Sequence, residues 1–295
     1  MLPLALIING KGDMSMKIEQ FQDIHYEKDD QGIVTITINT PKRKNAMSYL
    51  TFLEFFWAVD IMEKDETAKA MIITGAKDPE NTDPTREAFS SGGYFSIDVL
   101  ENLPDEIRNQ IDMADIAQKK LTVKMFEFEK PVIAAINGLA IGAGFTMPFS
   151  CADLIYLSEH AWIRLPFVNL GIVPEFALTY LLPRIIGFQR AKEIVYFHKK
   201  ISAREAFELG LVNEVLPHDE LLPTARERAL QLIPPQGAGL AIRLTKRAFN
   251  RPYIEAIKKA LDMENEGLNR GVTSRDFGEG VLARMERRDP VFTGE

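Results

Sequence analysis

The sequence predicts an α/β fold with a helical C-terminal region, and three observations support this. Strand patterns alternate with helix patterns from residue 32 to residue 213. Short turns, several of them rich in glycine, separate these units, and only helix patterns follow residue 213. The chain has 295 residues, of which 46% are hydrophobic and 26% charged, so it can bury a large core.

The strands are predicted from short apolar or β-branched runs. Gly32–Asn39 alternates isoleucine, valine and threonine, which is typical of a strand. Three shorter and mainly apolar runs also predict strands, over residues 70–74, 132–136 and 154–157. The polar segment Ala76–Ala88 contains two prolines and is expected to be an exposed loop.

Four helices are predicted within the α/β region from apolar residues at helical spacing or from helix-start signals. They cover residues 48–63, residues 105–128 up to Pro131, residues 145–152, and a segment entered at Pro174 after a strand-like or turn region over 163–173.

Prolines separate three further helix patterns near the C-terminus, over residues 219–233, 238–250 and 252–269. We therefore divide the chain into an N-terminal extension (1–15), a core (16–213) and a helical C-terminal region (214–295). The extension begins with apolar residues, but no cationic segment precedes them and no small-residue cleavage site follows, so it does not resemble a secretion signal.

Composition excludes several classes of function. Thirty-five basic and 42 acidic residues give a net charge of −7, which argues against nucleic acid or an anionic membrane as the main partner. A local basic pocket for a phosphorylated small molecule stays open. No apolar run approaches the roughly 20 residues of a membrane span. One cysteine and four scattered histidines predict no metal site and no disulfides, as expected in the cytoplasm.

Two glycine turns carry the first chemical signal, at residues 89–94 (FSSGGY) and 137–145 (NGLAIGAGF). Glycine lets a backbone N–H approach a ligand closely, and the second turn opens a helix whose dipole adds positive charge. Two such N–H groups aimed at one carbonyl oxygen form an oxyanion hole. For either turn alone, a plain tight turn is the favoured interpretation. A dinucleotide-binding turn is disfavoured because Met147 stands where a small residue is needed.

Six stretches together make the signal specific: PKRKNAM from residue 41, FSSGG from 89, KPVIAAINGLAIGAG from 130, NLGIVP from 169, AFELGLVN from 206, and residues 279–292 from Glu-Gly to Pro-Val-Phe. In this order and spacing they resemble the crotonase superfamily, also called the enoyl-CoA hydratase/isomerase family, over residues 16–295.

The resemblance implies a spiral of ββα units and a C-terminal region that mediates trimer contacts, as a homotrimer or a dimer of trimers. It implies an acyl-CoA thioester substrate, a place in fatty acid metabolism, and no cofactor other than the coenzyme A of the substrate. The oxyanion-hole donors fall on the N–H groups of Gly93 and Ala143. Gly93 and Tyr94 stand where relatives often have alanine and aspartate, but the donor is backbone and is kept. Further substrate-binding positions fall on Lys44, Ala46, Ser91, Gly92, Gly142, Thr146, Phe167 and Arg287.

The predicted acid–base residues separate the possible reactions. Hydratases of this family use two glutamates, one to activate water and one to protonate carbon. Those positions fall on Thr146 and Phe167, which cannot transfer a proton usefully. Some enoyl-CoA isomerases instead carry one carboxylate in a Pro-Glu pair, which matches Glu175. Without the resemblance, a plain first-turn helix acid would be the favoured interpretation of Glu175 after Pro174.

The sequence thus predicts an enzyme that stabilises a thioester enolate, with Δ3,Δ2-enoyl-CoA isomerase first among the activities. Enoyl-CoA hydratase, or another lyase or hydrolase of the superfamily, is the alternative. A non-catalytic member that binds acyl-CoA or RNA is an alternative of another class. Lys42–Lys44 could hold coenzyme A phosphates or be a solvated run, Cys151 is expected in the core, and Phe52–Trp57 in the core or a contact surface.

Overall fold

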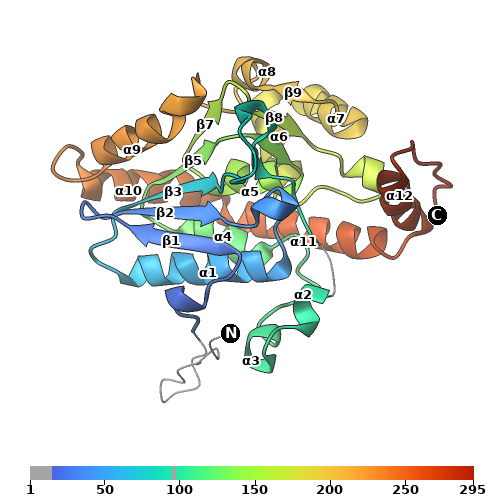
Figure 1. The fold of residues 1–295 in the computed structure, drawn as a ribbon, viewed down its shortest axis with the longest axis horizontal. Coiled ribbons are helices and arrows are strands. Elements are labelled where there is room, and N and C mark those ends of the chain that lie inside the picture. The colour runs from blue at the N-terminus through green and yellow to red at the C-terminus, as the bar shows by residue number, and fades with distance from the viewer. Residues whose placement is uncertain (1–14, 95–97) are drawn as a thin grey trace.

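Two sheets organise the fold in the computed structural model, which describes residues 15–94 and 98–295 (Figure 1). The larger sheet has strand order β1-β2-β3-β5-β7-β10 and the smaller has order β4-β6-β8-β9. The strands are β1 (Ile24–Lys28), β2 (Ile33–Ile38), β3 (Ala70–Gly75), β4 (Ala88–Ser90), β5 (Val132–Ile136), β6 (Leu139–Ile141), β7 (Leu154–Ser158), β8 (Trp162–Arg164), β9 (Ile201–Ser202) and β10 (Glu214–Leu216). Residues 1–14 of the predicted extension lie outside the described residues.

From β3 to β8, successive strands alternate between the two sheets. β3, β5 and β7 pair in parallel in the large sheet, while β4, β6 and β8, which follow each of them in the chain, pair in parallel in the small sheet. Each turn of the chain therefore adds one strand to each sheet and returns through helical segments. This is the ββα spiral that the resemblance implies, and the predicted α/β class with a helical C-terminal region is confirmed.

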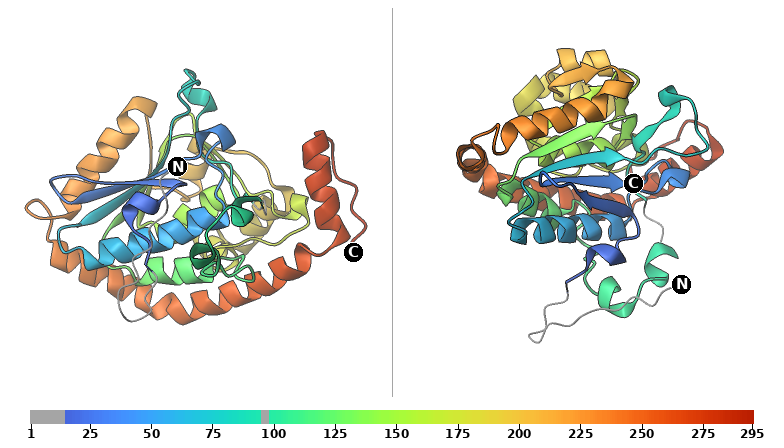
Figure 2. Two further views of the ribbon diagram at one scale, coloured as in Figure 1. Left: turned by 60° about the horizontal axis from the view of Figure 1, so that its bottom comes forward. Right: turned by 60° about the vertical axis from the view of Figure 1, so that its left-hand side comes forward.

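The helices cover both faces of the large sheet (Figures 1 and 2). They are α1 (Tyr49–Lys64), α2 (Asp98–Glu101), α3 (Asp105–Arg108), α4 (Lys119–Glu127), α5 (Ala143–Cys151), α6 (Leu178–Ile186), α7 (Phe188–Phe197), α8 (Ala203–Glu208), α9 (Leu221–Leu232), α10 (Gly239–Asn250), α11 (Ile254–Gly271) and α12 (Arg275–Glu286). α1, α4 and α5 pack on one face, and α9 packs on the other.

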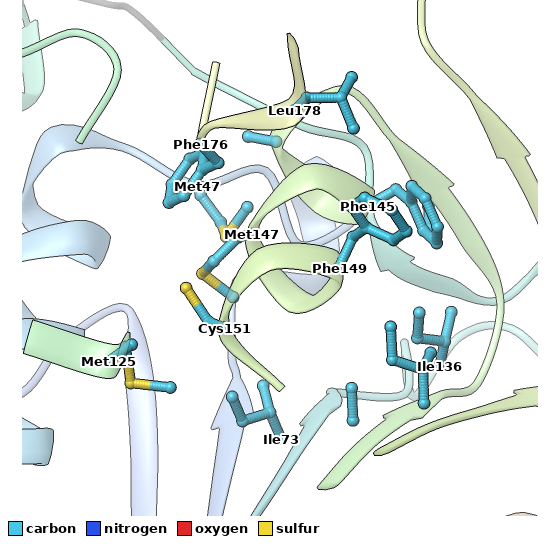
Figure 3. Close-up of a cluster of buried hydrophobic side chains, with 14 of the residues drawn as sticks. Met47, Ile73, Met125, Ile136, Phe145, Met147, Phe149, Cys151, Phe176 and Leu178 are labelled. Atoms are coloured by element: carbon cyan, nitrogen blue, oxygen red, sulfur yellow. The ribbon is translucent and has the colours of Figure 1, made fainter. Parts of the chain in front are cut away.

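Strand periodicity explains why the central strands are apolar throughout. In β3, Met71 and Ile73 point into the core under α1, whereas Ala70 and Ile72 point toward α9. A strand buried on both faces needs apolar residues at every position, as the run over 70–74 indicated. Figure 3 shows the core around α5, where Met147 and Cys151 lie near Met47. Burial raises the pKa of the Cys151 thiol to about 12, so it is a core residue rather than a nucleophile.

The predicted continuous helix over 105–128 is wrong. The chain forms α3 and α4 with a non-helical segment over 109–118 between them. The Asp115 carboxylate accepts hydrogen bonds from the backbone N–H groups of Lys119 and Lys120. The Asn265 side chain of α11 donates to the Asp115 carboxylate and accepts from the N–H of Ala117. Short polar side chains that bond nearby backbone compete with helix, and here they break it.

The helix expected to begin at Pro174 begins four residues later, at Leu178. Phe176 and Ala177 have φ of 59° and 58°, in the left-handed region, so residues 174–177 form a tight turn before α6. β10 is a further strand beyond residue 213, where only helices were expected, and it pairs in parallel with β7. The division of the chain at residues 213 and 214 stays a prediction.

None of the helices in the described ranges combines the length and the apolar character that crossing a bilayer requires.

Candidate active site

The two glycine turns lie against each other because β4 and β6 are neighbours in the small sheet. A Cβ atom on Gly92 would lie 2.5 Å from the carbonyl oxygen of Ile141 and 3.7 Å from the nitrogen of Ala143. A Cβ on Gly144 would overlap the carbonyl oxygen of Ser90. Gly92 and Gly142 also have φ of 96° and 52°, which glycine adopts without strain. Glycine at these positions is therefore what allows the two backbones to touch.

The N–H groups of Gly93 and Ala143 are both available at this contact. Gly92 and Tyr94 flank Gly93 and take the two backbone bonds to Met47, at 2.9 and 2.8 Å. Ala143 is the first residue of α5, where N–H groups have no acceptor within the helix. Neither N–H donates to an acceptor within residues 15–94 and 98–295. The positive end of the α5 dipole lies here too.

Two side chains border the second turn at the positions expected for hydratase glutamates. The Phe167 ring lies 3.9 Å from where a Cβ on Gly142 would be, and the residue is only 3% exposed. Thr146 lies three residues into α5 beyond Ala143 and is fully buried. Its hydroxyl has no hydrogen-bond partner among the described residues, which is costly for a buried polar group unless a ligand or water meets it.

Glu175 is buried, at 4% exposed, in the turn before α6. Its carboxyl group accepts no hydrogen bond from the part of the chain that the structure describes. Burial raises the pKa of Glu175 to about 8, and the negative charge of Glu264 adds to the increase. Phe176 and Ala177, which follow it, are fully buried and give the turn apolar surroundings.

A cavity of about 250 Å³ lies between α1 and the segment that leads into α4, and residues 174–177 do not line it directly. Most of its wall is apolar, from Tyr49, Phe52, Leu53, Phe56, Trp57, Ile111 and Leu121. Polar and charged side chains complete the wall, namely Gln110, Asp112, Asp115, Gln118 and Lys120. Two observations connect it to Glu175. Phe52 packs on Phe176, and the charge of Glu175, after burial, raises the pKa of Tyr49. The aromatic run Phe52–Trp57 thus supplies both core and cavity wall.

The basic run near residue 43 lies next to the first glycine turn. Ser91 donates its N–H to the carbonyl oxygen of Lys44 at 2.9 Å and its hydroxyl to that of Arg43 at 3.1 Å. Arg43 lies over the ring of Tyr94 at 4.6 Å and 3.4 Å from Asp23, so its charge is already engaged. Lys44 is exposed and lines a cavity of about 260 Å³, and Ala46 is buried behind it.

Arg287 is not joined to the other predicted residues within this chain. It is exposed at the C-terminal end of α12, which stands at one end of the molecule in Figure 2. Its guanidinium forms no ion pair with a described residue, whereas the neighbouring Arg288 pairs with Glu279 and Glu286.

A serine, a histidine and a glutamate also meet, and the glutamate, Glu87, accepts a hydrogen bond from Asn137 at the start of the second glycine turn. The Ser158 hydroxyl lies 3.0 Å from His218 Nδ1, and His218 Nε2 lies 3.3 Å from Glu87. Ser158 is fully buried, so no substrate can reach its hydroxyl. This group therefore stabilises the fold and does not support a serine-hydrolase mechanism.

Sequence reasoning did not single out Glu264. This residue of α11 is 2% exposed and bonds the backbone of the turn that carries Glu175. A signal was present in the helix pattern, because Glu264 falls on the same helix face as Ile257, Leu261 and Leu268, which are buried. A charged residue on an apolar helix face indicates a specific partner.

The spiral and its paired glycine turns define a protein of the crotonase superfamily. A family model described as enoyl-CoA hydratase/isomerase matches residues 28–295, and the chain belongs to this family of enzymes. It is 33% identical over 273 residues to the crotonyl-CoA hydratase of Syntrophomonas wolfei, covering 92% of this chain and 98% of that one. It is 29% identical over 280 residues to the 1,2-epoxyphenylacetyl-CoA isomerase of Escherichia coli, covering 92% and 97%.

Solved structures agree with this assignment. An enoyl-CoA hydratase/isomerase from Pseudoalteromonas atlantica T6c superimposes with a TM-score of 0.77 and 26% identity, covering 92% of this chain and 100% of that one. An enoyl-CoA hydratase from Mycobacterium avium subsp. paratuberculosis gives a TM-score of 0.76 and 27% identity, covering 92% and 99%.

Proposed function

We propose that this enzyme is a Δ3,Δ2-enoyl-CoA isomerase, which moves the double bond of an acyl-CoA thioester from C3 to C2. One observation carries the proposal. Glu175 is a buried carboxyl group with no hydrogen-bond donor among the described residues, near a mainly apolar cavity. Thr146 and Phe167, at the two positions expected for hydratase glutamates, carry no side chain that can act usefully as an acid or base near neutral pH.

The chemistry requires one base and one anion-stabilising site. The thioester oxygen accepts hydrogen bonds from the N–H groups of Gly93 and Ala143. The Glu175 carboxylate removes a proton from C2, and the electrons form a dienolate whose negative charge lies on that oxygen. The protonated Glu175 then returns the proton to C4, so no atom is gained or lost. A carboxyl group with a raised pKa is suited to both transfers, because it binds and releases a proton near neutral pH.

The acyl tail is proposed to enter the cavity between Tyr49 and Trp57. Phe52 lines this cavity and packs on Phe176, which supports a tail position near the turn of Glu175. The mainly apolar wall of the cavity suits a hydrocarbon chain. The coenzyme A portion of the substrate is proposed to bind near Lys44 and Ser91, at the first glycine turn. Coenzyme A enters only as part of the substrate in this proposal, and no separate cofactor takes part.

Enoyl-CoA hydratase is the second candidate, because several relatives carry that name. Hydration needs a group that activates water in addition to one that protonates carbon. Glu264 is the other buried carboxyl close to Glu175, but both of its oxygens already accept hydrogen bonds. Among residues 15–94 and 98–295, no second carboxylate close to Glu175 is free to activate water, and this favours isomerisation.

Product analysis tests the proposal. The enzyme is incubated separately with a 3-enoyl-CoA and with the matching 2-enoyl-CoA, and products are identified by mass and absorbance. Isomerisation keeps the mass and creates the absorbance of a conjugated thioester. Addition of one water to the 2-enoyl-CoA, with no conversion of the 3-enoyl-CoA, would establish the hydratase instead. Tight RNA association in filter binding at low salt would revive the non-catalytic alternative, against the net charge of −7.

Trimeric assembly is part of the same proposal. Large apolar side chains are exposed on two C-terminal helices, among them Leu240, Leu244 and Phe249 on α10 and Met285 on α12. Such side chains are typical of surfaces that another subunit covers. Sedimentation should give three times the monomer mass or six times, and a stable monomer at micromolar concentration contradicts this.

A further inference from the structure

The backbone of the turn that carries Glu175 has an unfavourable conformation. Phe176 and Ala177 both have φ near 60°, and neither is glycine, so the left-handed region is sterically costly for each of them. Two such residues in succession persist only where neighbouring groups hold them. The position of the proposed base therefore depends on the contacts of the residues that follow it.

Glu264 supplies most of these contacts from α11. One carboxylate oxygen accepts the N–H of Ala177 at 2.7 Å, and the other accepts the N–H of Thr179 at 2.9 Å and its hydroxyl at 2.6 Å. From the other side, the Ser150 hydroxyl of α5 donates to the carbonyl oxygen of Phe176. The turn is thus fixed between α5 and α11.

These bonds replace a cap that the local sequence lacks. Ala177 occupies the N-cap position of α6, and its side chain cannot accept from the first N–H groups of the helix. Glu264 accepts two of them from a position 87 residues further along the chain. Its negative charge also lies at the positive end of the α6 dipole, where a carboxylate is favoured.

We propose that Glu264 is a positioning residue for the reaction, which caps α6 and holds the left-handed turn so that the Glu175 carboxyl faces the substrate. This rests on the proposed role of Glu175 as the base. It assigns Glu264 no contact with substrate and no proton transfer.

The charge of Glu264 gives this role a second and separable effect. Within the described residues, Glu264 from α11 and Tyr49 from α1 are the titratable groups that interact electrostatically with Glu175. Burial raises the pKa of Glu264 to about 7, and the hydrogen bonds from Thr179 and Ala177 oppose this increase by favouring the ionised carboxylate. Its charge then opposes ionisation of Glu175, and the pH at which the base becomes active lies higher than burial alone would set.

The test is Glu264→Gln with Glu54→Gln as a matched control. Glu54 on α1 is also fully buried, and its carboxylate also accepts three hydrogen bonds, from the N–H groups of Gln22, Asp23 and Ile24 at 2.7, 2.9 and 3.0 Å. Both substitutions should lower stability. Glu264→Gln alone should lower kcat, by roughly 10- to 100-fold with KM within about twofold, because a misplaced base slows chemistry more than binding.

The pH profile separates positioning from general damage. In Glu264→Gln the midpoint of the acid limb of kcat/KM should move to lower pH, by roughly half a unit or more, because the neighbouring negative charge is gone. In Glu54→Gln the midpoint should stay where it is in the parent enzyme. A merely structural role of Glu264 predicts equal losses in the two variants and no movement of the midpoint, and that result overturns the proposal.

Thr179→Ala keeps the inference testable if Glu264→Gln does not fold. It removes one of the three bonds to Glu264 while leaving the carboxylate in place. A smaller fall in kcat, about 3- to 10-fold at unchanged KM, is expected; unchanged kcat counts against positioning. Glu175→Gln is measured beside it. If Glu175→Gln loses turnover while Glu264→Gln and Thr179→Ala keep normal turnover, only the positioning role of Glu264 is rejected. If Glu175→Gln keeps full turnover, the proposed function itself is rejected.

Discussion

The aromatic rings of Phe52 and Phe176 lie 5.6 Å apart, with their planes inclined at 55°. Phe52 belongs to the cavity wall on α1, and Phe176 directly follows Glu175 in the chain. Inclined aromatic pairs at this distance attract each other, so the contact is a stable link. A tail that displaces Phe52 must also disturb the turn of the proposed base, which ties the fit of the acyl chain to the rate of the chemistry.

Glu175→Gln should lower isomerisation by about 10²–10⁴-fold, because the amide keeps the shape of the side chain and removes the base. Affinity for coenzyme A should change little, since Lys44 and Ser91, which are proposed to contact it, lie at the first glycine turn and not at the turn of Glu175. Turnover of 3-enoyl-CoA and binding of free coenzyme A are the two measurements. Near-normal turnover in the variant contradicts the assignment of the base.

The pH dependence of kcat/KM should follow the ionisation of Glu175 in the free enzyme. Because the proposed reaction begins with the carboxylate and burial raises its pKa to about 8, activity should rise about tenfold per pH unit at lower pH and level off above pH 8. Initial rates at low substrate concentration across the pH range give the profile. A profile already flat well below pH 8 is the contrary result.

Gly92→Ala should damage the proposed oxyanion hole. The added Cβ would lie 2.5 Å from the carbonyl oxygen of Ile141, so the second turn has to move and the Ala143 N–H moves with it. Loss of one such donor typically lowers kcat by about 10²–10³-fold. Gly210→Ala is the matched control, because Gly210 also has a positive φ, of 74°, but its Cβ would meet open space. It should cost about 1 kcal/mol of stability and leave kcat unchanged.

Trp57→Ala should shift the preference toward longer acyl chains. The indole lines the cavity and donates to Gln110 at 2.9 Å, so its removal lengthens the apolar space. Each additional buried methylene contributes about 0.8 kcal/mol, or roughly a fourfold increase in the kcat/KM ratio of the longer over the shorter substrate. Phe188→Ala, which removes an aromatic ring that is 60% exposed, should leave that ratio unchanged. An unaltered ratio in Trp57→Ala places the tail elsewhere.

Stability should fall as pH rises between about 4.5 and 8, and Glu54 should account for part of the fall. Burial raises the pKa of Glu54 to about 8 in the folded chain, from 4.5 in a model peptide. Between these two pKa values the folded state binds more protons than the unfolded state. The contribution of Glu54 to stability is therefore complete below pH 4.5 and is lost as the pH rises through about 8. Urea midpoints should decline less steeply with pH in Glu54→Gln; parallel slopes for parent and variant would falsify this account.

The central strands and the glycine turns were predictable because their causes are local. Apolar runs such as Ala70–Thr74 can form little else than a strand buried on both faces, and glycine is required wherever two backbones touch. β1 and β10 were not predicted, since IHYEK and EVL carry weak patterns and become strands through pairing with β2 and β7.

The conformation around the proposed base was not predictable from neighbouring residues. The strained turn at Phe176 and Ala177 is held by Glu264, and the break before α4 is held by Asn265, both on α11. These contacts join segments 87 and 148 residues apart, and no local pattern reports them. The sequence thus led to Glu175, but not to what fixes it.

Because strands alternate between two sheets, the residues proposed to hold the thioester and those proposed to hold the acyl tail come from different parts of the fold. The donors proposed to hold the thioester, Gly93 and Ala143, follow neighbouring strands of the small sheet, whereas the cavity wall comes from α1 and the segment before α4. Loops inserted between one strand pair and the next helix can therefore change in length or sequence without moving the donors. The acyl group that is accepted can therefore change in evolution while the proposed anion-stabilising donors stay in place.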